Sequence, residues 1–190
     1  MDFSELLKRR TVRRFDQKPL TRDEVRAVLE AARLASCAAN LQRLRYIAVM
    51  EPSLVAAILP HTAFGMMVHP KRQPVAGVTS PTAFIAVCST CDPNDGLHAE
   101  AGAAIQSMEF AAWNLGIGAT WLGSHKKPEV AALLGVEDSE RILYMVALGR
   151  PGETPCREDV GADASVKYYL DESDRLHVPK YTVDAITTWK

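Results

Sequence analysis

The sequence lacks any long apolar run, since charged residues recur throughout and no stretch approaches the ~18 consecutive apolar residues of a membrane span. It also lacks an excess of charge of one sign: 22 Lys and Arg face 23 Asp and Glu, for a formal net charge of −1. That balance argues against a globally basic nucleic-acid binder and against an acidic disordered tail. We therefore expect neither a membrane nor a nucleic acid as partner.

Cysteine is scarce, and the first residues, MDFSELLKRR, lack the basic-then-apolar layout of a signal peptide. The cysteines at 37, 88, 91 and 156 are therefore expected to be thiols in a reducing cytoplasm. The CxxC formed by Cys88 and Cys91 has no second pair, and the histidines show no ligand spacing, so we expect no metal site. There is also no nucleophile elbow and no phosphate-binding Gly-Lys-Ser/Thr loop.

Length and apolar patterning predict a single α+β domain over residues 1–190. A chain of 190 residues fits one hydrophobic core, and it shows no internal repeat or low-complexity linker. Apolar residues at helical spacing predict helices, and short apolar runs bounded by Pro or Gly predict buried strands. The expected helices cover 2–9, 21–34, 54–59, 99–115 and 128–134, and the expected strands cover 46–50, 82–88, 119–122 and 142–148. The helix at 21–34 is expected to begin with a capping box, since Thr21 and Glu24 have that spacing. Such strands need cover on both faces, which indicates a three-layer helix–sheet–helix domain.

Two segments lack this periodicity. Residues 61–81 contain Pro70, Pro74 and a Lys71-Arg72 pair, and they are interpreted as a mobile or partly helical loop. Residues 150–190 have few periodic apolar positions, so they are expected to form an extended arm that lies on another surface, such as a partner subunit.

The strongest local signal of a binding site is the run KRRTVRR at residues 8–14. Residues 1–22 hold seven Lys or Arg and three acids, a net charge of +4. One interpretation is a solvated basic helix end, because cations suit a helix C-terminus. The alternative is an anion site, because five cations in seven residues repel one another unless an anion lies among them. Arg binds phosphate through paired hydrogen bonds and Thr adds a neutral donor, so a phosphate-bearing ligand is the sharper hypothesis.

Two further segments offer groups to a flat ligand. Residues 36–42, SCAANLQ, combine small side chains with the amides of Asn40 and Gln42, which can pair with the edge of an amide-like ring. Residues 116–124, GIGATWLGS, place glycines where backbone N–H groups can be exposed at a strand end. Taken alone, each segment is equally compatible with an ordinary connection, a helix-to-strand loop in the first case and a helix C-cap with a turn in the second.

Taken together and in this order, these segments resemble the FMN-dependent nitroreductase family. The family's Arg-Arg-Ser/Thr-x-Arg-x-Phe motif is matched by residues 9–15, and its Pro-Ser-Ser-x-Asn-x-Gln-Pro-Trp motif is similar to residues 36–44. The alanine-rich helix followed by GIGATWLG resembles the family's central helix and strand, and ALGRP at 147–151 resembles its last-strand signature. The likeness covers roughly residues 3–152, with a looser likeness at LHVPK, residues 176–180.

The resemblance implies an intertwined homodimer with one FMN in each of two clefts at the subunit interface. From one subunit, the residues expected at the phosphate, ribityl chain and ring edge are Arg9, Arg10, Thr11 and Arg13. From the other subunit, those expected to border the isoalloxazine ring are Cys37, Ala38, Asn40 and Gln42. Backbone groups of Leu122, Gly123 and Ser124 are expected near flavin N5, and Arg157, with Arg150 as its rival, is expected to complete the phosphate site.

The implied activity is hydride transfer from NAD(P)H through flavin N5 to a nitroaromatic, quinone or similar acceptor by a ping-pong mechanism. Because the cofactor carries this chemistry, no side chain is assigned a catalytic role. Cys37-Ala38 and Arg43-Leu44 depart from the family's Ser-Ser and Pro-Trp, which removes two hydroxyl donors to the ring. Two alternatives therefore stand beside the reductase: different flavin chemistry, such as flavin fragmentation or dehalogenation, and a non-catalytic flavin binder.

Overall fold

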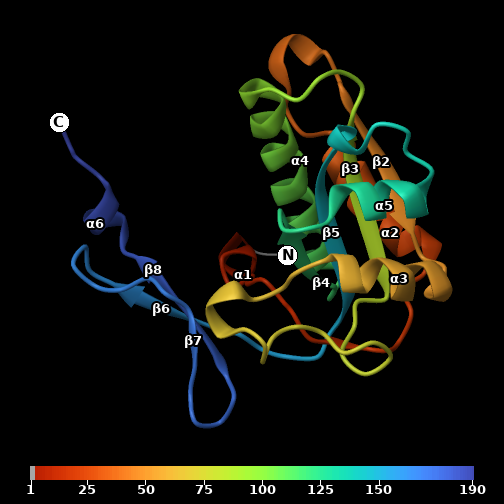
Figure 1. The fold of residues 1–190 in the computed structure, drawn as a ribbon. Helices are drawn as coiled ribbons and strands as arrows, with labels where there is room; N and C mark the ends of the chain where they lie inside the picture. Colours follow the sequence, from red (N-terminus) through yellow and green to blue (C-terminus); the bar gives the residue numbers. More distant parts are fainter. Residues whose placement is uncertain (1–2) are drawn as a thin grey trace.

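The computed structural model describes residues 3–190, and a five-stranded sheet lies at its centre (Figure 1). The longest strand, β5 (Ile142–Pro151), pairs antiparallel with β3 (Ala83–Ser89), β4 (Gly118–Leu122) and the short β1 (Phe15–Asp16). The remaining strand, β2 (Leu44–Val49), pairs antiparallel with β3. The four strands expected from the apolar runs are therefore all present, and β1 is added to them.

Helices cover both faces of this sheet. They are α2 (Arg22–Arg33) and α4 (Asp95–Asn114) on one face, and α3 (Pro52–Ile58) and α5 (Lys127–Leu134) on the other. Because successive side chains of a strand point to opposite faces, β3 contributes Ala83, Ile85 and Val87 to the first core and Phe84, Ala86 and Cys88 to the second. Every residue of β3 is buried, which confirms the predicted three-layer arrangement.

The observed helix ends differ in how well they match the predicted ones. Thr21 caps α2 through the predicted capping box with Glu24. The helix expected over 99–115 begins earlier, at Asp95, because the side chain of Asn94 accepts the backbone N–H of Leu97. The helix expected over 2–9 is reduced to α1 (Phe3–Leu6), and its first expected residue lies outside the described residues. The segment that follows α1 is extended and lies beside β4, where the N–H of Val12 donates to the carbonyl of Ala119 at 3.1 Å.

Short 3-10 turns fill several connections. They are η1 (Ala38–Asn40), η2 (Leu59–His61), η3 (Met66–Val68) and η4 (Ser139–Arg141). Two of them lie at or within residues 61–81, so the partly helical alternative describes this loop better than the mobile one. The loop is also anchored to the body, because Phe64 and Arg72 are each only 1% exposed.

The arm formed by residues 150–190 leaves the body, as Figure 1 shows, and it carries a second sheet that the sequence did not predict. In this sheet β6 (Cys156–Val160) runs parallel to β8 (Leu176–Tyr181), and β7 (Tyr169–Leu170) pairs antiparallel with β8. The arm ends with α6 (Val183–Ile186). Its strands were missed because they are short and only Leu176 and Pro179 among their residues are buried. Within residues 3–190, no helix combines the length and apolar character needed to cross a membrane.

Candidate functional site

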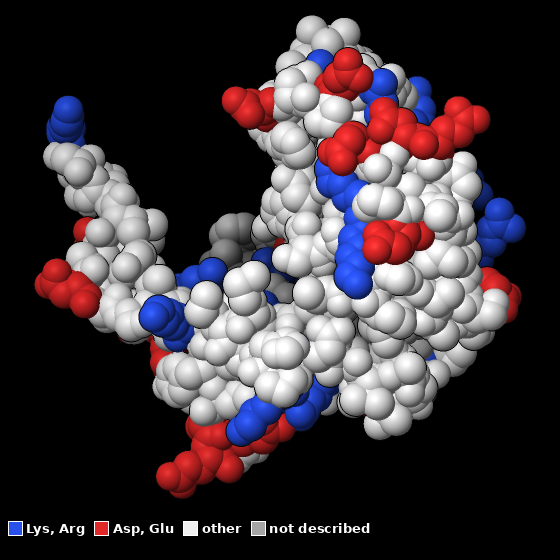
Figure 2. Space-filling view, in the orientation of Figure 1, with Lys and Arg blue, Asp and Glu red and all other residues white. Residues whose placement is uncertain are grey.

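The basic cluster and the arm together line a small cavity. Figure 2 shows Lys and Arg side chains in the hollow between the body and the arm. The residues that line the cavity are Arg9, Arg10, Thr11 and Arg13 from the body and Tyr168, Val178 and Lys180 from the arm. All four residues predicted from the basic run are therefore brought to one place, because the chain between α1 and β1 is extended alongside β4.

Positive charge in this cavity exceeds what nearby acids neutralise. Burial lowers the pKa of Arg10, and repulsion from Arg157 and Arg9 lowers it further, while Asp159 opposes the shift. Burial also lowers the pKa of Arg13, while Tyr168, Glu153 and Glu109 oppose that shift. Cations whose protonated form is disfavoured by neighbouring cations gain stability when an anion binds among them.

Unsatisfied donors point to the same ligand class. The buried Nε of Arg10 and Nη1 of Arg9 have no hydrogen-bond partner among the described residues. The Nη1 atom of Arg9 does lie 3.2 Å from Oε2 of Glu109, which is an ion pair without hydrogen-bond geometry. A buried unsatisfied donor costs about 1–3 kcal/mol, so phosphate oxygens that accept from these groups fit the site.

Arg13 is held where the body, the 61–81 loop and the arm meet. Its guanidinium lies 4.8 Å from the centre of the Tyr168 ring, a cation–π contact. Its backbone N–H donates to Oε1 of Glu153 at 2.6 Å. The hydroxyl of Tyr168 in turn accepts the N–H of Met67 at 3.1 Å. Tyr168 could not be found from the sequence, because its contact depends on how the arm lies on the body.

The two arginines proposed to complete the phosphate site are placed differently. Arg157, on β6, pairs with Asp159 at 2.9 Å and lies close enough to Arg10 to lower its pKa. Arg150, on β5, is instead ion-paired with Glu24 of α2 and does not line the cavity. Lys180 does line the cavity but was not among the predicted site residues, although the looser family likeness at 176–180 was a signal that pointed to it.

The predicted ring-contacting loop has a strained backbone. Ala39, Asn40 and Gln42 have positive φ angles of 48°, 52° and 50°, which are uncommon for residues with a side chain. Glu100 of α4 holds this loop: its Oε1 atom accepts from the N–H of Ala38 at 3.3 Å and from Nη2 of Arg43 at 2.5 Å. Strain that is held in place by its surroundings is common at functional sites.

A cavity of about 410 Å³ adjoins the loop. Its lining includes Cys37, Gln42, Arg43, Tyr46 and Glu100, whereas Ala38 and Asn40 do not line it. Of the predicted ring contacts, two therefore border a cavity within the single chain.

Within one chain, the loop and the basic cluster lie toward opposite ends of α4. Glu100 contacts the loop and Glu109 pairs with Arg9, and these two positions of α4 are nine residues apart. At 1.5 Å per residue that separation is about 13.5 Å along the helix. The two halves of the predicted flavin site are thus not assembled into one cavity by a single copy.

Strand β4 runs beside the basic segment. It ends at residues 122–124, whose backbone groups were predicted to lie near flavin N5. Gly118 packs against Val12 so closely that a Cβ atom there would lie 2.9 Å from the Val12 side chain. At the other end, Leu122 is buried, Gly123 lies beside Tyr144, and the carbonyl of Ser124 accepts the N–H of Ala63 at 3.0 Å. Residues 122–124 therefore begin three positions beyond Ala119, the residue that Val12 contacts, which is about 10 Å along the strand.

Comparisons with known proteins agree with this architecture. A family model described as "Nitroreductase family" matches residues 6–150. A relative from Archaeoglobus fulgidus, described as "Putative NADH dehydrogenase/NAD(P)H nitroreductase", is 27% identical over 151 residues, which cover 75% of this chain and 81% of the relative. The structure of a nitroreductase family protein from Clostridium novyi NT has a TM-score of 0.67 at 19% identity, covering 83% of this chain and 89% of that one. The structure of a "putative nitroreductase in complex with fmn" from Desulfovibrio desulfuricans has a TM-score of 0.62 at 27% identity, covering 80% and 86%.

Proposed function

The chain belongs to the nitroreductase family, and from this membership we propose that it is an FMN-dependent oxidoreductase. NAD(P)H is the proposed electron donor, and a nitroaromatic, a quinone or a similar small molecule is the proposed acceptor, the two using one open site in turn. FMN would supply the two-electron chemistry, so no side chain has to act as nucleophile or general base. The site residues serve to bind, to orient and to balance charge.

The observation that carries the cofactor proposal is the buried Nε of Arg10, which has no hydrogen-bond partner within residues 3–190 and lies in a cavity with excess positive charge. Arg9, Arg10, Thr11 and Arg13 would hold the phosphate end of FMN, with Lys180 and Arg157 of the arm beside them. Glu109 would keep the Arg9 guanidinium in place while neutralising only part of the cluster. Support for the ligand also comes from the Desulfovibrio desulfuricans neighbour, whose structure is of a complex with FMN.

We further propose that the working form is a homodimer in which the chain forms one domain and its arm packs on a second copy. The separation of the two site halves along α4 supports this, because Cys37, Ala38, Asn40 and Gln42 of one copy can then border the ring held by the other. The arm also exposes large apolar side chains, with Ile186 68% and Trp189 76% exposed, as expected of a surface that a partner covers.

An FMN titration of the Arg10→Ala variant tests the cofactor site. Loss of a charge-assisted hydrogen bond is worth about 1.5–3 kcal/mol, so FMN affinity is expected to fall by about 10–100-fold. Arg26→Ala is the matched control, since Arg26 is exposed on α2, outside the cavity, and its removal is expected to leave FMN affinity unchanged. Equal FMN affinity in wild type and Arg10→Ala would contradict the proposed phosphate site.

The departure of Cys37-Ala38 from the family's Ser-Ser favours one alternative, a flavin binder with different chemistry or none. Such a protein would bind FMN with the same dependence on Arg10 but would not oxidise NAD(P)H. Anaerobic addition of the nucleotide therefore distinguishes the two proposals.

A further inference from the structure

A buried arginine fastens the arm to the body. Arg72, in the 61–81 loop, is only 1% exposed although it carries a charge. Its Nε donates to Oε2 of Glu153 at 2.8 Å and its Nη1 donates to Oδ1 of Asp174 at 3.1 Å. Its Nη2 donates to the backbone carbonyl of Asp174 at 2.5 Å. We refer to Arg72, Glu153 and Asp174 as the arm clasp.

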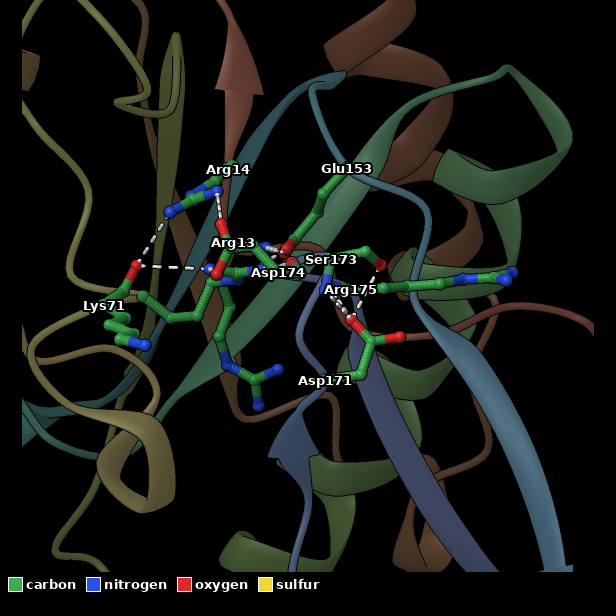
Figure 3. Close-up of polar contacts among 9 residues, drawn as sticks. Arg13, Arg14, Lys71, Glu153, Asp171, Ser173, Asp174 and Arg175 are labelled. Atoms are coloured by element: carbon green, nitrogen blue, oxygen red, sulfur yellow. Dashed lines mark hydrogen bonds and ion pairs between the residues drawn. The ribbon is translucent and has the colours of Figure 1, made fainter.

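The clasp joins the segments that enter the two parallel strands of the arm, β6 and β8, to one point of the body. Glu153 follows β5 at the root of the arm, and Asp174 lies in the turn just before β8. Arg14 reinforces the contact, since its Nη1 lies 2.6 Å from Oδ2 of Asp174 and its Nη2 donates to the carbonyl of Lys71 at 3.2 Å. Figure 3 shows Arg14 contacting Asp174, with Glu153 close by in the same cluster.

The turn that carries Asp174 is built to present it. Oδ1 of Asp171 accepts from the backbone N–H groups of Ser173 and Arg175, both at 2.9 Å, so the turn is closed on itself (Figure 3). Asp174 has a φ of 61°, a left-handed conformation that Asp tolerates better than most residues. Both the side chain and the carbonyl of Asp174 thereby face Arg72.

The clasp also reaches the proposed phosphate site. Glu153 uses one oxygen for Arg72 and the other for the backbone N–H of Arg13, at 2.6 Å. Gly65 permits this approach, because a Cβ atom there would lie 2.7 Å from Cβ of Arg72 and 3.4 Å from Cδ of Arg13. Glu153 therefore links the guanidinium of Arg72 to the backbone of Arg13.

From these contacts we propose that Arg72 is a positioning residue for the cofactor site. Acting through Glu153 and Asp174, it sets the backbone of Arg13 and holds Tyr168 and Lys180 of the arm against the basic cluster. Three acceptors in three directions require the fork of a guanidinium, which an ammonium group on a flexible stem does not reproduce. The link to the cofactor rests on the proposed function, whereas the fastening of the arm does not.

Hydrogen exchange and FMN titration of Arg72→Lys and Arg72→Met test the proposal in the full chain as purified. Both variants are expected to exchange faster by about tenfold or more at residues 13–15 and 168–178, with β3 unchanged, and to bind FMN about tenfold or more weakly. Glu153→Gln keeps an acceptor for the Arg13 N–H but loses the charge, so it is expected to loosen 168–178 more than 13–15. Arg141→Lys is the control, since Arg141 also bridges two aspartates, Asp92 and Asp138, away from the arm.

Each outcome decides one part of the proposal. Unchanged exchange at 168–178 in folded Arg72→Lys and Arg72→Met proteins would overturn the clasp. Faster exchange with unchanged FMN affinity would overturn its role in positioning the site. Wild-type protein that binds no FMN would refute the proposed function instead, and the exchange measurement would still decide whether Arg72 fastens the arm.

Discussion

Oε2 of Glu109 lies 3.2 Å from Nη1 of Arg9, and this buried carboxylate approaches the basic cluster from α4. Burial raises the pKa of Glu109, and the neighbouring Arg9 and Arg13 oppose that shift. The pair neutralises one arginine and leaves the rest of the cluster in need of an anion. The Glu109 carboxylate thus determines how much negative charge a ligand has to bring to the cluster.

The Glu109→Gln substitution removes the negative charge of this side chain and keeps its size and shape. It leaves the partly buried Arg9 without its counter-charge, so we expect the free energy of unfolding to fall by about 1–3 kcal/mol, less than for a fully buried pair. Inorganic phosphate or FMN should restore part of this loss, because the anion replaces the missing carboxylate charge. Thermal unfolding with and without phosphate measures both effects. A loss that phosphate does not reduce would contradict the placement of the anion beside Arg9.

A pair of glycine substitutions tests the strain in the loop at 37–42. Ala39 has a φ of 48°, whereas the neighbouring Ala38 has an ordinary backbone, and both are exposed. Ala39→Gly relieves a left-handed residue and is expected to leave stability unchanged or raise it by up to about 1 kcal/mol. Ala38→Gly is expected to lower stability by about 0.5–1 kcal/mol, because only the entropy of the unfolded chain changes. Denaturant unfolding measures the difference, and equal destabilisation by both would show that Ala39 is not strained.

Close packing of β4 against the basic segment is tested by Gly118→Ala. The new Cβ would lie 2.9 Å from the Val12 side chain, so the segment has to shift. We expect a loss of about 1–3 kcal/mol of stability, as for overpacked cores, together with weaker FMN binding. Gly161→Ala is the control, because no atom of the described residues lies within 4 Å of its Cβ position. If Gly118→Ala and Gly161→Ala behave alike in unfolding and in FMN titration, the basic segment does not depend on this contact.

The sheet of the arm is expected to weaken as pH rises. The Nδ1 and Nε2 atoms of His177 lie 2.5 Å from Glu158 and 2.9 Å from Asp171, so only the protonated ring can donate to both. Hydrogen bonds with Asp171 and Glu158 raise the pKa of His177, and hydrogen bonding by His177 lowers the pKa of each acid. A raised histidine pKa contributes stability that is complete below about pH 6.5 and is lost as pH rises through the folded-state value. The acids contribute above about pH 4 and lose their contribution as pH falls.

Hydrogen exchange of β8 against pH measures this dependence, after correction for the intrinsic rate. Protection is expected to be greatest between about pH 4.5 and 6.5 and to decline above that range. In the His177→Gln variant, β8 should be less protected in that range, and its protection should change less as pH rises. Wild-type protection of β8 that stays constant from pH 6 to 9 would contradict a protonated His177 ring that hydrogen-bonds to both acids.

Local patterns predicted the core layers but not the arm contacts. The apolar run at 82–88 predicted β3, and Thr21 with Glu24 predicted the start of α2, because each signal depends on residues close in sequence. The start of α4 was missed because Asp95 and Gly96 are weak helix formers that obscure the cap at Asn94. The burial of Arg72 could not be predicted, because its partners Glu153 and Asp174 are 81 and 102 positions away. The basic cluster was predictable as a ligand site, whereas Tyr168 and Glu109 join it only through the fold.

Anaerobic reduction of the purified protein tests the account most directly. The visible absorption spectrum is recorded after FMN reconstitution, and NADH or NADPH is then added without oxygen. The account predicts a yellow protein whose flavin absorption bleaches on addition of one of the two nucleotides and returns when a quinone or nitroaromatic is added. A protein that stays colourless after reconstitution, or a yellow protein that neither nucleotide bleaches, would contradict the proposed oxidoreductase.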